Sequence, residues 1–140
     1  EPRSILWHYY EFGKNKINYY WMERNRYVLM FSYYRLWTLF VLLPMIVVMD
    51  VAILIFSLKN GWFDMKGKMY RDLFSEDFWR WIGERRRVIQ AERLIGDREL
   101  LRLAVSTIEF QEEAVKNPLL DYIGNPLLRA YWWAAKWLIV

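Results

Sequence analysis

Hydrophobic and polar positions divide this chain into one long apolar stretch and several segments that mix charged and aromatic residues. The apolar stretch covers residues 36–58, LWTLFVLLPMIVVMDVAILIFSL. Only four residues interrupt it, namely Thr38, Pro44, Asp50 and Ser57. A helix of this length extends about 34 Å at roughly 1.5 Å per residue, enough to cross a hydrocarbon core of about 30 Å. The pattern predicts a transmembrane or re-entrant helix that is kinked at Pro44.

The segment before this stretch predicts a helix over residues 14–35 that continues into the apolar stretch with no evident break. At about 100° per residue, one side of this helix carries an apolar and aromatic stripe of Ile17, Tyr20, Trp21, Tyr27, Val28 and Phe31. Arg24 falls in the middle of that stripe. Because an unpaired buried charge costs several kcal/mol, Arg24 is expected to meet a carboxylate, a phosphate or lipid headgroups.

The segment after the apolar stretch predicts an amphipathic helical hairpin. Ser75 precedes two acidic residues and is therefore the expected N-cap of a helix that extends to about residue 95. Gly96 ends this helix, and Asp97 caps a second helix that is expected to extend to about residue 114. Residues 127–140, LLRAYWWAAKWLIV, begin another apolar segment that is cut short at the end of the chain.

The expected fold class is all-α, with membrane-associated helices. Its four parts are a linker and aromatic interfacial helix over residues 1–35, the transmembrane or re-entrant helix over 36–58, the amphipathic hairpin over 59–126 and the interfacial start of a second apolar segment over 127–140. Tryptophan and basic side chains near the apolar segments are expected at the membrane interface. These are Trp21, Arg35, Trp37, Lys59, Trp62, Trp132, Trp133, Lys136 and Trp137.

Composition supports an interfacial protein and argues against nucleic-acid binding. The chain has 140 residues, with nine Trp and ten Tyr, and a net charge of +4 that is not concentrated on one predicted face. Such a charge suits an anionic leaflet or a phosphate-bearing ligand better than nucleic acid. Basic residues flank both ends of the apolar stretch, so the positive-inside rule gives no orientation. The absence of cysteine excludes disulfides and thiolate zinc sites. Because the chain starts without Met and stops inside an apolar run, we expect an excised fragment.

Charged residues outside these patterns favour structural roles. Asp50 lies inside the apolar stretch, where a carboxylate costs about 2.5–3.5 kcal/mol on insertion scales, so it is expected to hold a basic residue of the hairpin or to lie at the interface. Arg85, Arg86 and Arg87 are consecutive and fan around a helix axis, so ion pairing is favoured over a common basic surface. His8 lies among aromatic residues, and packing or headgroup contact is its default role.

Two stretches resemble the membrane-proximal part of family 2 glycosyltransferases. The first is HYYEFGKNKINYYWMERNRYVLM, in which His8 is followed by a tyrosine-rich stretch that ends in Arg24 and Asn25. The second is RRRVIQAERLIGDRELLRL, which resembles the helix-turn-helix that follows the membrane segment in those proteins. Phosphate-cradling glycine loops, catalytic serine motifs and Asp-x-Asp pairs do not occur in the chain, so no complete active site is expected within it.

The resemblance implies a role for three residues. In this family a divalent metal, Mg or Mn, holds the diphosphate of the nucleotide sugar in a catalytic domain, and a His near the end of that domain often supplies a ligand, the position that His8 matches. Arg24 is expected to reach the donor diphosphate or the phosphate of a lipid-linked acceptor, with Asn25 fixing the local backbone. Snorkelling of Arg24 to headgroups is an equally good interpretation.

The implied function is anchoring of a missing N-terminal catalytic domain to the cytoplasmic side of the plasma membrane. The expected partners are membrane lipid, a nucleotide sugar and a lipid-linked or polysaccharide acceptor, and no cofactor is expected in this chain alone. One alternative is a noncatalytic membrane scaffold or assembly subunit that binds partner helices. Another is a soluble helical bundle with residues 36–58 as its central helix. The sequence leaves the oligomeric state open.

Overall fold

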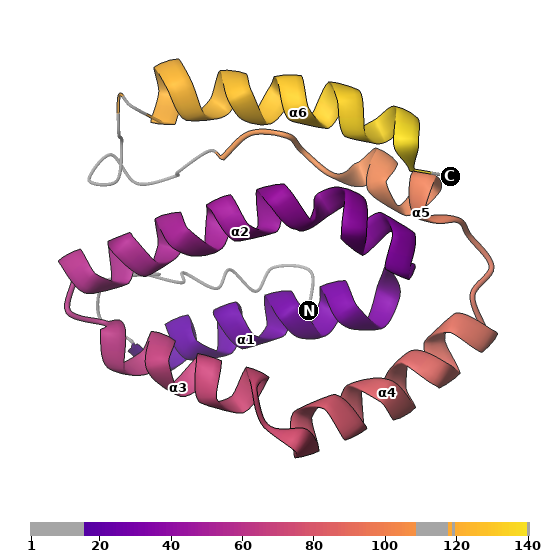
Figure 1. Ribbon diagram of the computed structural model, residues 1–140, viewed down its shortest axis with the longest axis horizontal. Helices are drawn as coiled ribbons and strands as arrows, with labels where there is room; N and C mark the ends of the chain where they lie inside the picture. The colour runs from indigo at the N-terminus through magenta and orange to yellow at the C-terminus, as the bar shows by residue number, and fades with distance from the viewer. Residues whose placement is uncertain (1–15, 109–117, 119, 140) are drawn as a thin grey trace, which may run out of the picture.

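The computed structural model describes residues 16–108, 118 and 120–139, and the elements in this part of the chain are helices (Figure 1). They are, in order, α1 (Lys16–Tyr33), α2 (Leu36–Lys59), α3 (Phe63–Leu73), α4 (Glu76–Ala91), α5 (Asp97–Leu100), the 3-10 turn η2 (Leu101–Leu103), the π-helical turn η4 (Leu120–Gly124) and α6 (Asn125–Leu138). These described residues include no strand, which confirms the all-α prediction for this part of the chain.

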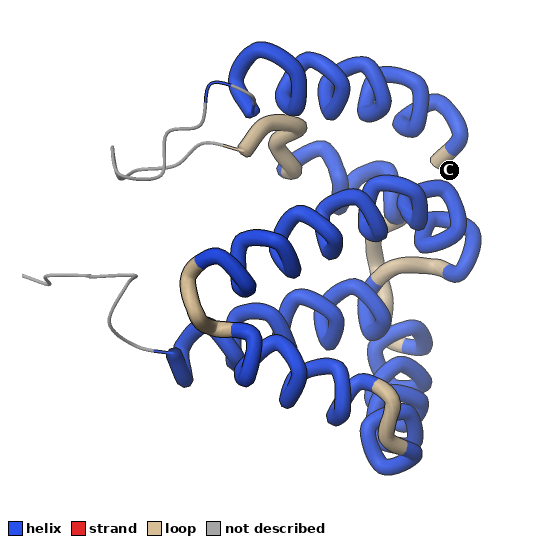
Figure 2. Tube along the Cα trace, turned by 60° about the vertical axis from the view of Figure 1, so that its left-hand side comes forward, coloured by secondary structure: helices blue, strands red, loops and turns tan. Residues whose placement is uncertain are grey.

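The first two helices run antiparallel, and α2 lies between α1 on one side and α6 on the other (Figure 1). At one end, Nζ of Lys16 in α1 donates a hydrogen bond to the carbonyl of Gly61, 2.9 Å away and just beyond α2. At the other end only Tyr34 and Arg35 separate the two helices. Figure 2 shows α3 and α4 on the same side of α2 as α1. Helix α1, with 18 residues, therefore runs along most of α2, which has 24.

Most of the surface of α2 is exposed. It is the one described helix that is long and apolar enough to cross a membrane, yet only 6% of its apolar 18-residue window is buried. The helix passes through Pro44 without interruption, and its buried residues are Thr38, Val41 and Ser57. A central helix of a soluble bundle would be mostly buried. The soluble-bundle interpretation therefore does not fit this structure.

The buried apolar side chains form three small clusters instead of one central core. One cluster joins α2, α5 and α6 and contains Val41, Leu101, Ala135 and Ile139. Another joins α1 to α3 through Tyr20, Tyr27 and Met69. A third joins α1 to α4 through Val28, Phe78 and Ile82. Three residues of the predicted α1 stripe are thus buried in two of these clusters and Phe31 packs against them, whereas Ile17 and Trp21 are exposed. Helix α1 is the helix that α3 and α4 share.

The chain breaks between α1 and α2, where the sequence predicted continuity. Arg86 and Gln90 on α4, together with Arg93 two residues after this helix, donate hydrogen bonds of 2.6 to 3.2 Å to carbonyls at and directly after the end of α1. The accepting carbonyls belong to Phe31, Ser32, Tyr33 and Tyr34. Because the last carbonyls of a helix have no partner within the helix, these side chains stabilise its end. Helix α1 therefore stops here, and the chain turns into α2.

Asp97 completes this corner from the other side. Its side chain is fully buried, forms an ion pair with Arg93 and accepts a 2.8 Å hydrogen bond from the backbone N–H of Arg35, the residue that precedes α2. Burial alone would raise the pKa of Asp97, but the hydrogen bonds that it accepts outweigh burial and hold this pKa below its usual value. Their donors are Thr38, the backbone of Arg35, and Arg93. A carboxylate at the start of a helix also interacts favourably with the helix dipole.

The predicted hairpin is correct in the start of its first helix, which ends at Ala91 and not at about residue 95, and it is wrong in its second helix. Ser75 caps α4 as expected, since its hydroxyl accepts a hydrogen bond from the backbone N–H of Phe78. The second helix, predicted over residues 97–114, ends after the short turn η2, and the backbone of Ala104 is extended. Asp97 starts this helix, but its carboxylate points to the corner instead of capping its own N-terminus. Residues 109–117 of the predicted helix lie outside the described residues.

The three consecutive arginines also differ from expectation. Arg86 binds backbone carbonyls, and the guanidinium of Arg85 lies 5.7 Å from the ring centre of Trp81. Neither residue forms an ion pair with a carboxylate of the described chain, nor does Arg87. Arg86 donates to carbonyls at the end of α1, and the sequence of α4 alone does not reveal these acceptors.

Replacing Asp97 with asparagine is expected to lower the melting temperature at neutral pH, because the neutral amide binds Arg93 and the start of α2 more weakly. The lowered pKa of Asp97 means that its stabilisation is present above the ordinary pKa of about 4 and is lost as the pH falls through the lower folded-state pKa. Thermal unfolding in detergent, followed by circular dichroism, should show a difference between the two proteins that narrows in acid.

The matched control is Glu99→Gln, an exposed acidic residue in the same short helix. It should leave the melting temperature almost unchanged at every pH. If the melting temperature of the wild type exceeded that of Asp97→Asn by the same amount in strong acid, this would contradict the proposed ionic role of Asp97.

Candidate membrane-docking site

A cluster of four charged side chains joins α1, α2 and α3. Nζ of Lys66 lies 2.6 Å from Oε2 of Glu23 and 2.6 Å from Oδ1 of Asp50. The guanidinium of Arg26 lies 3.1 Å and 3.2 Å from the same two oxygens. The side chain of Lys66 is fully buried, and Glu23 is nearly so. The cluster contains two cations and two carboxylates, so its formal charge is zero.

Two tyrosines complete the coordination of Asp50. The hydroxyls of Tyr27 and Tyr70 donate hydrogen bonds to its two carboxylate oxygens, and Nζ of Lys66 lies 4.9 Å from the ring centre of Tyr70. Burying a charge is costly unless it is paired and hydrogen-bonded, and each of these carboxylates meets both conditions. This arrangement therefore neutralises Asp50, the one charge that α2 carries within its apolar stretch.

This geometry agrees with the structural role expected for Asp50, which holds a basic residue of the segment after α2. The sequence did not identify Lys66 as that residue, nor the participation of Glu23 and Arg26. Glu23 and Arg26 are three residues apart and thus share one side of α1, a signal that could have indicated an ion pair. Their contact with α2 depends on the fold, and no local pattern predicts it.

Exposed aromatic and aliphatic side chains cover α2 and α6 on the surface away from this cluster. Trp37 is 55% exposed, Trp133 63% and Trp137 66%. Two hydrogen bonds attach α6 to the first half of α2: Nε1 of Trp37 donates to the carbonyl of Leu138 at 2.8 Å, and the hydroxyl of Tyr131 donates to the carbonyl of Val41. An extended exposed apolar surface is typical of a membrane or protein interaction site.

Most of the predicted interface residues lie at the surface. The exposed members of the set are Trp21, Arg35, Trp37, Lys59, Trp133, Lys136 and Trp137, and Trp132 is half-buried. Trp62 differs, because only 8% of it is exposed and its ring lies 5.1 Å from that of Tyr19 and 5.7 Å from that of Phe56. Gly61 adopts a φ of +70°, which returns the chain toward α1 and packs Trp62 inside. Trp62 is therefore packed inside the structure, and its position at the membrane interface stays a prediction.

Arg24 has aromatic neighbours instead of an acidic partner. Its guanidinium carbon lies 5.6 Å from the ring centre of Trp21, 5.7 Å from that of Phe78 and 5.3 Å from that of Trp81. No carboxylate of the described residues pairs with it. Cation–π contacts of this kind stabilise a desolvated guanidinium. Asn25 is exposed. Contact of Arg24 and Asn25 with a phosphate stays a prediction.

The metal-binding prediction concerns His8, which lies outside the described residues. Within the part of the chain that the structure describes, no group of three or more His, Cys, Asp or Glu side chains is arranged to hold a metal ion. A divalent metal in the parent enzyme, with His8 as one ligand, therefore stays a prediction from the resemblance.

Comparison with known proteins does not identify a family. A scan against protein-family models, a search of curated proteins and a search of solved structures found no match to this chain. The geometry of the cluster and of the exposed surface is therefore the direct basis for a functional argument.

Replacing Lys66 with methionine is expected to destabilise the protein strongly. Methionine has a similar length but no charge, so Asp50 and Glu23 would remain buried without their shared cation. Removing one partner of a buried ion pair costs about 3–5 kcal/mol in the free energy of unfolding. Thermal and chemical unfolding in detergent measures this loss.

Lys59→Met is the matched control, because Lys59 is exposed in the last turn of α2. Its loss should be below about 1 kcal/mol, the size of a helix-dipole contribution. Combining Lys66→Met with Asp50→Asn should recover part of the lost stability, since the buried carboxylate is then also neutral. Equal effects of Lys66→Met and Lys59→Met would show that the cluster does not hold the helices together.

Proposed function

We propose that this chain is the membrane-anchoring C-terminal part of a family 2 glycosyltransferase. The enzyme would transfer a sugar from a nucleotide-sugar donor to a lipid-linked or cell-surface polysaccharide acceptor. The observation that carries this proposal is that α1, which holds most of the first resembling stretch, and α4, which holds the start of the second, pack on each other. Val28 of the first stretch lies in one apolar cluster with Phe78 and Ile82, which precede the second stretch on α4. Arg86, Gln90 and Arg93 of the second stretch also bind carbonyls at the end of α1, directly after the first stretch.

The module docks on the membrane with α2 in the plane of the interface. Because α1 runs antiparallel beside most of α2, it would enter a bilayer to most of the depth that α2 reaches. Helix α3 presents Lys68 and Arg71 as exposed cations beside the middle of α2, where Lys66 meets Asp50. An exposed cation at the bilayer centre costs about 2.5–3.5 kcal/mol on insertion scales. An in-plane α2 keeps these charges in water and its apolar surface in lipid.

Anchoring supports sugar transfer by holding two reactants at one surface. A catalytic domain that precedes α1 would be kept against the cytoplasmic leaflet of the plasma membrane, where a lipid-linked acceptor presents its hydroxyl. Restricting both to the same surface raises the effective concentration of the acceptor. In this arrangement His8 would lie between the catalytic domain and α1, which suits a ligand to the divalent metal on the donor diphosphate.

A noncatalytic membrane scaffold is the second candidate. The exposed apolar surfaces of α2 and α6 favour it, since partner helices can pack on such surfaces as lipid does. The two candidates differ in the residues encoded before Glu1. An Asp-x-Asp motif on a strand-helix pattern favours the enzyme, and its absence favours the scaffold.

Single cysteines can test the in-plane placement, because the chain contains none of its own. Arg35→Cys and Lys59→Cys place a thiol at either end of α2. In inside-out membrane vesicles, a membrane-impermeant maleimide should label both positions, and in right-side-out vesicles neither. A spanning helix would expose one position in each type of vesicle, which would contradict the in-plane arrangement.

Glu84→Cys is the control for this labelling, since Glu84 is exposed on α4, on the polar side of the structure. It should be labelled in the same vesicles as the two ends of α2. Labelling of all three positions only in right-side-out vesicles would overturn the cytoplasmic placement while retaining the in-plane one.

Sugar transfer is expected from the parent chain and not from residues 1–140. Purified residues 1–140 should release no nucleoside diphosphate from nucleotide sugars, because the described residues contain no metal-binding cluster for a diphosphate. The chain with its preceding catalytic domain should do so in membranes with Mg or Mn present. Turnover by residues 1–140 alone would overturn the anchoring role, and a parent chain without any turnover would favour the scaffold.

A further inference from the structure

We infer that the cleft between α6 and the α5–η2 turn binds the phosphate group of a membrane lipid. The cleft has a volume of about 790 Å³. This inference rests on the proposed membrane docking but not on sugar transfer. No residue that lines the cleft belongs to the charged cluster of Lys66 or to the apolar contact between α1 and α4.

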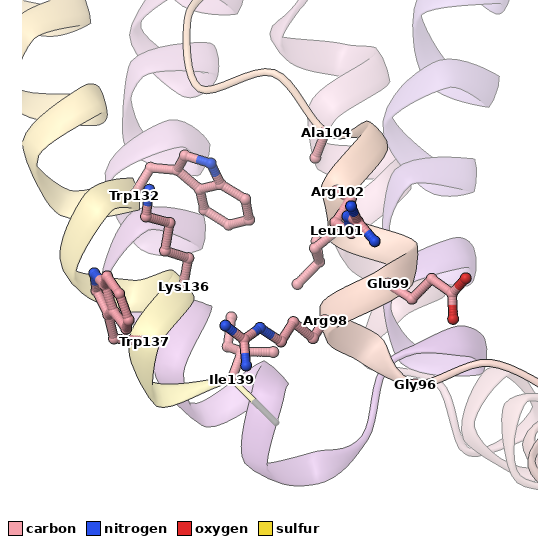
Figure 3. Close-up of a pocket in the computed structure, with 10 residues that line it drawn as sticks. All are labelled: Gly96, Arg98, Glu99, Leu101, Arg102, Ala104, Trp132, Lys136, Trp137 and Ile139. Atoms are coloured by element: carbon pink, nitrogen blue, oxygen red, sulfur yellow. The ribbon is translucent and has the colours of Figure 1, made fainter.

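Three cations line the cleft from two sides. Arg98 and Arg102 come from the α5–η2 turn, and Lys136 comes from α6. Figure 3 shows Arg98 reaching across the cleft toward α6, whereas the side chain of Lys136 runs along α6 toward Trp132. Glu99 is the one acidic residue among the lining residues, and its carboxylate points away from the cleft (Figure 3).

These cations have no anionic partner within the described chain. None of the three forms an ion pair or a side-chain hydrogen bond with another described residue. Elsewhere in the structure, Arg26, Arg93 and Lys66 all bind carboxylates. Three cations around one cleft repel one another unless an anion joins them, and guanidinium groups bind phosphate oxygens in bidentate fashion. The charge of the cleft therefore selects a phosphate group.

The floor of the cleft indicates that this phosphate belongs to a lipid. Leu101 and Ile139 line the cleft and are buried, with 6% and 2% exposed. Trp132 and Trp137 line its α6 side, and Trp137 is largely exposed next to the surface that carries Trp37. An inorganic phosphate gains nothing from an apolar floor. A lipid places its phosphate among the cations and its first methylene groups against the leucine, isoleucine and tryptophan side chains.

Binding to vesicles of defined composition tests the inference. The probe is phosphatidylcholine vesicles that contain phosphatidic acid, compared with vesicles that contain the same density of negative charge as oleic acid, a carboxylate. The cleft variant is Arg98→Gln with Arg102→Gln, and the matched variant is Arg71→Gln with Arg87→Gln, two exposed arginines outside the cleft. Both variants lose the same charge, so general attraction to the surface weakens equally.

The cleft variant should bind phosphatidic acid vesicles at least about tenfold more weakly than the matched variant, because charge-assisted hydrogen bonds to phosphate are lost. On oleic acid vesicles the two variants should bind alike. Equal losses on phosphatidic acid would overturn the cleft site and leave only charge attraction. If inorganic phosphate at the same concentration as the lipid phosphate displaces the protein from these vesicles, a free phosphate is sufficient. That result would overturn the assignment of the bound phosphate to a lipid.

Two further measurements separate this inference from failures of folding and of docking. Lys136→Gln removes a cation from the other side of the cleft, and its exposed position leaves the packing intact, so the same selective loss should appear. Circular dichroism should give all variants the helix content of the unchanged chain. A chain that binds neither kind of vesicle would overturn the membrane docking itself, and with it the lipid site.

Discussion

The ion cluster around Lys66 is the interaction on which the arrangement of the helices depends. Helix α2 carries one charge within its apolar stretch, Asp50, and Lys66 of α3 and Arg26 of α1 neutralise it. Glu23 balances the second cation. Because removing any one of these groups leaves the buried cluster with an unbalanced charge, the cluster holds three helices in one relative position. An apolar helix that would otherwise have no preferred neighbour is thereby attached to two polar ones.

This attachment gives α2 two different sides. The charged helices α1, α3 and α4 lie on one side, where the capped corner of Asp97 also holds the start of α2. Helix α6 packs beside the first half of α2 and adds exposed tryptophans to its apolar surface. Polar and apolar surfaces therefore lie on different sides of the molecule, which is the property that an interfacial membrane module needs. The cationic cleft lies where α6 meets the α5–η2 turn, next to that apolar surface.

Local signals predicted the elements, and long-range contacts decided the rest. The apolar stretch and the Ser75 cap located α2 and α4 because both depend on residues close in sequence. The partner of Asp50 lies 16 residues further along the chain, so only the fold could select Lys66 among several basic residues. The break before α2 requires donors from α4, and the burial of Trp62 follows from the turn at Gly61. The corner draws Asp97 away from the long helix that its local sequence predicted.

Polarised infrared spectroscopy of the protein in oriented bilayers tests the central claim most directly. Helices α1, α2 and α6 run nearly parallel or antiparallel to one another, so their amide I transition moments report one common direction (Figure 1). If the Lys66 cluster holds α2 in the plane of the membrane, the amide I dichroism will place these helix axes parallel to the bilayer surface. Dichroism that places them along the bilayer normal would contradict the account.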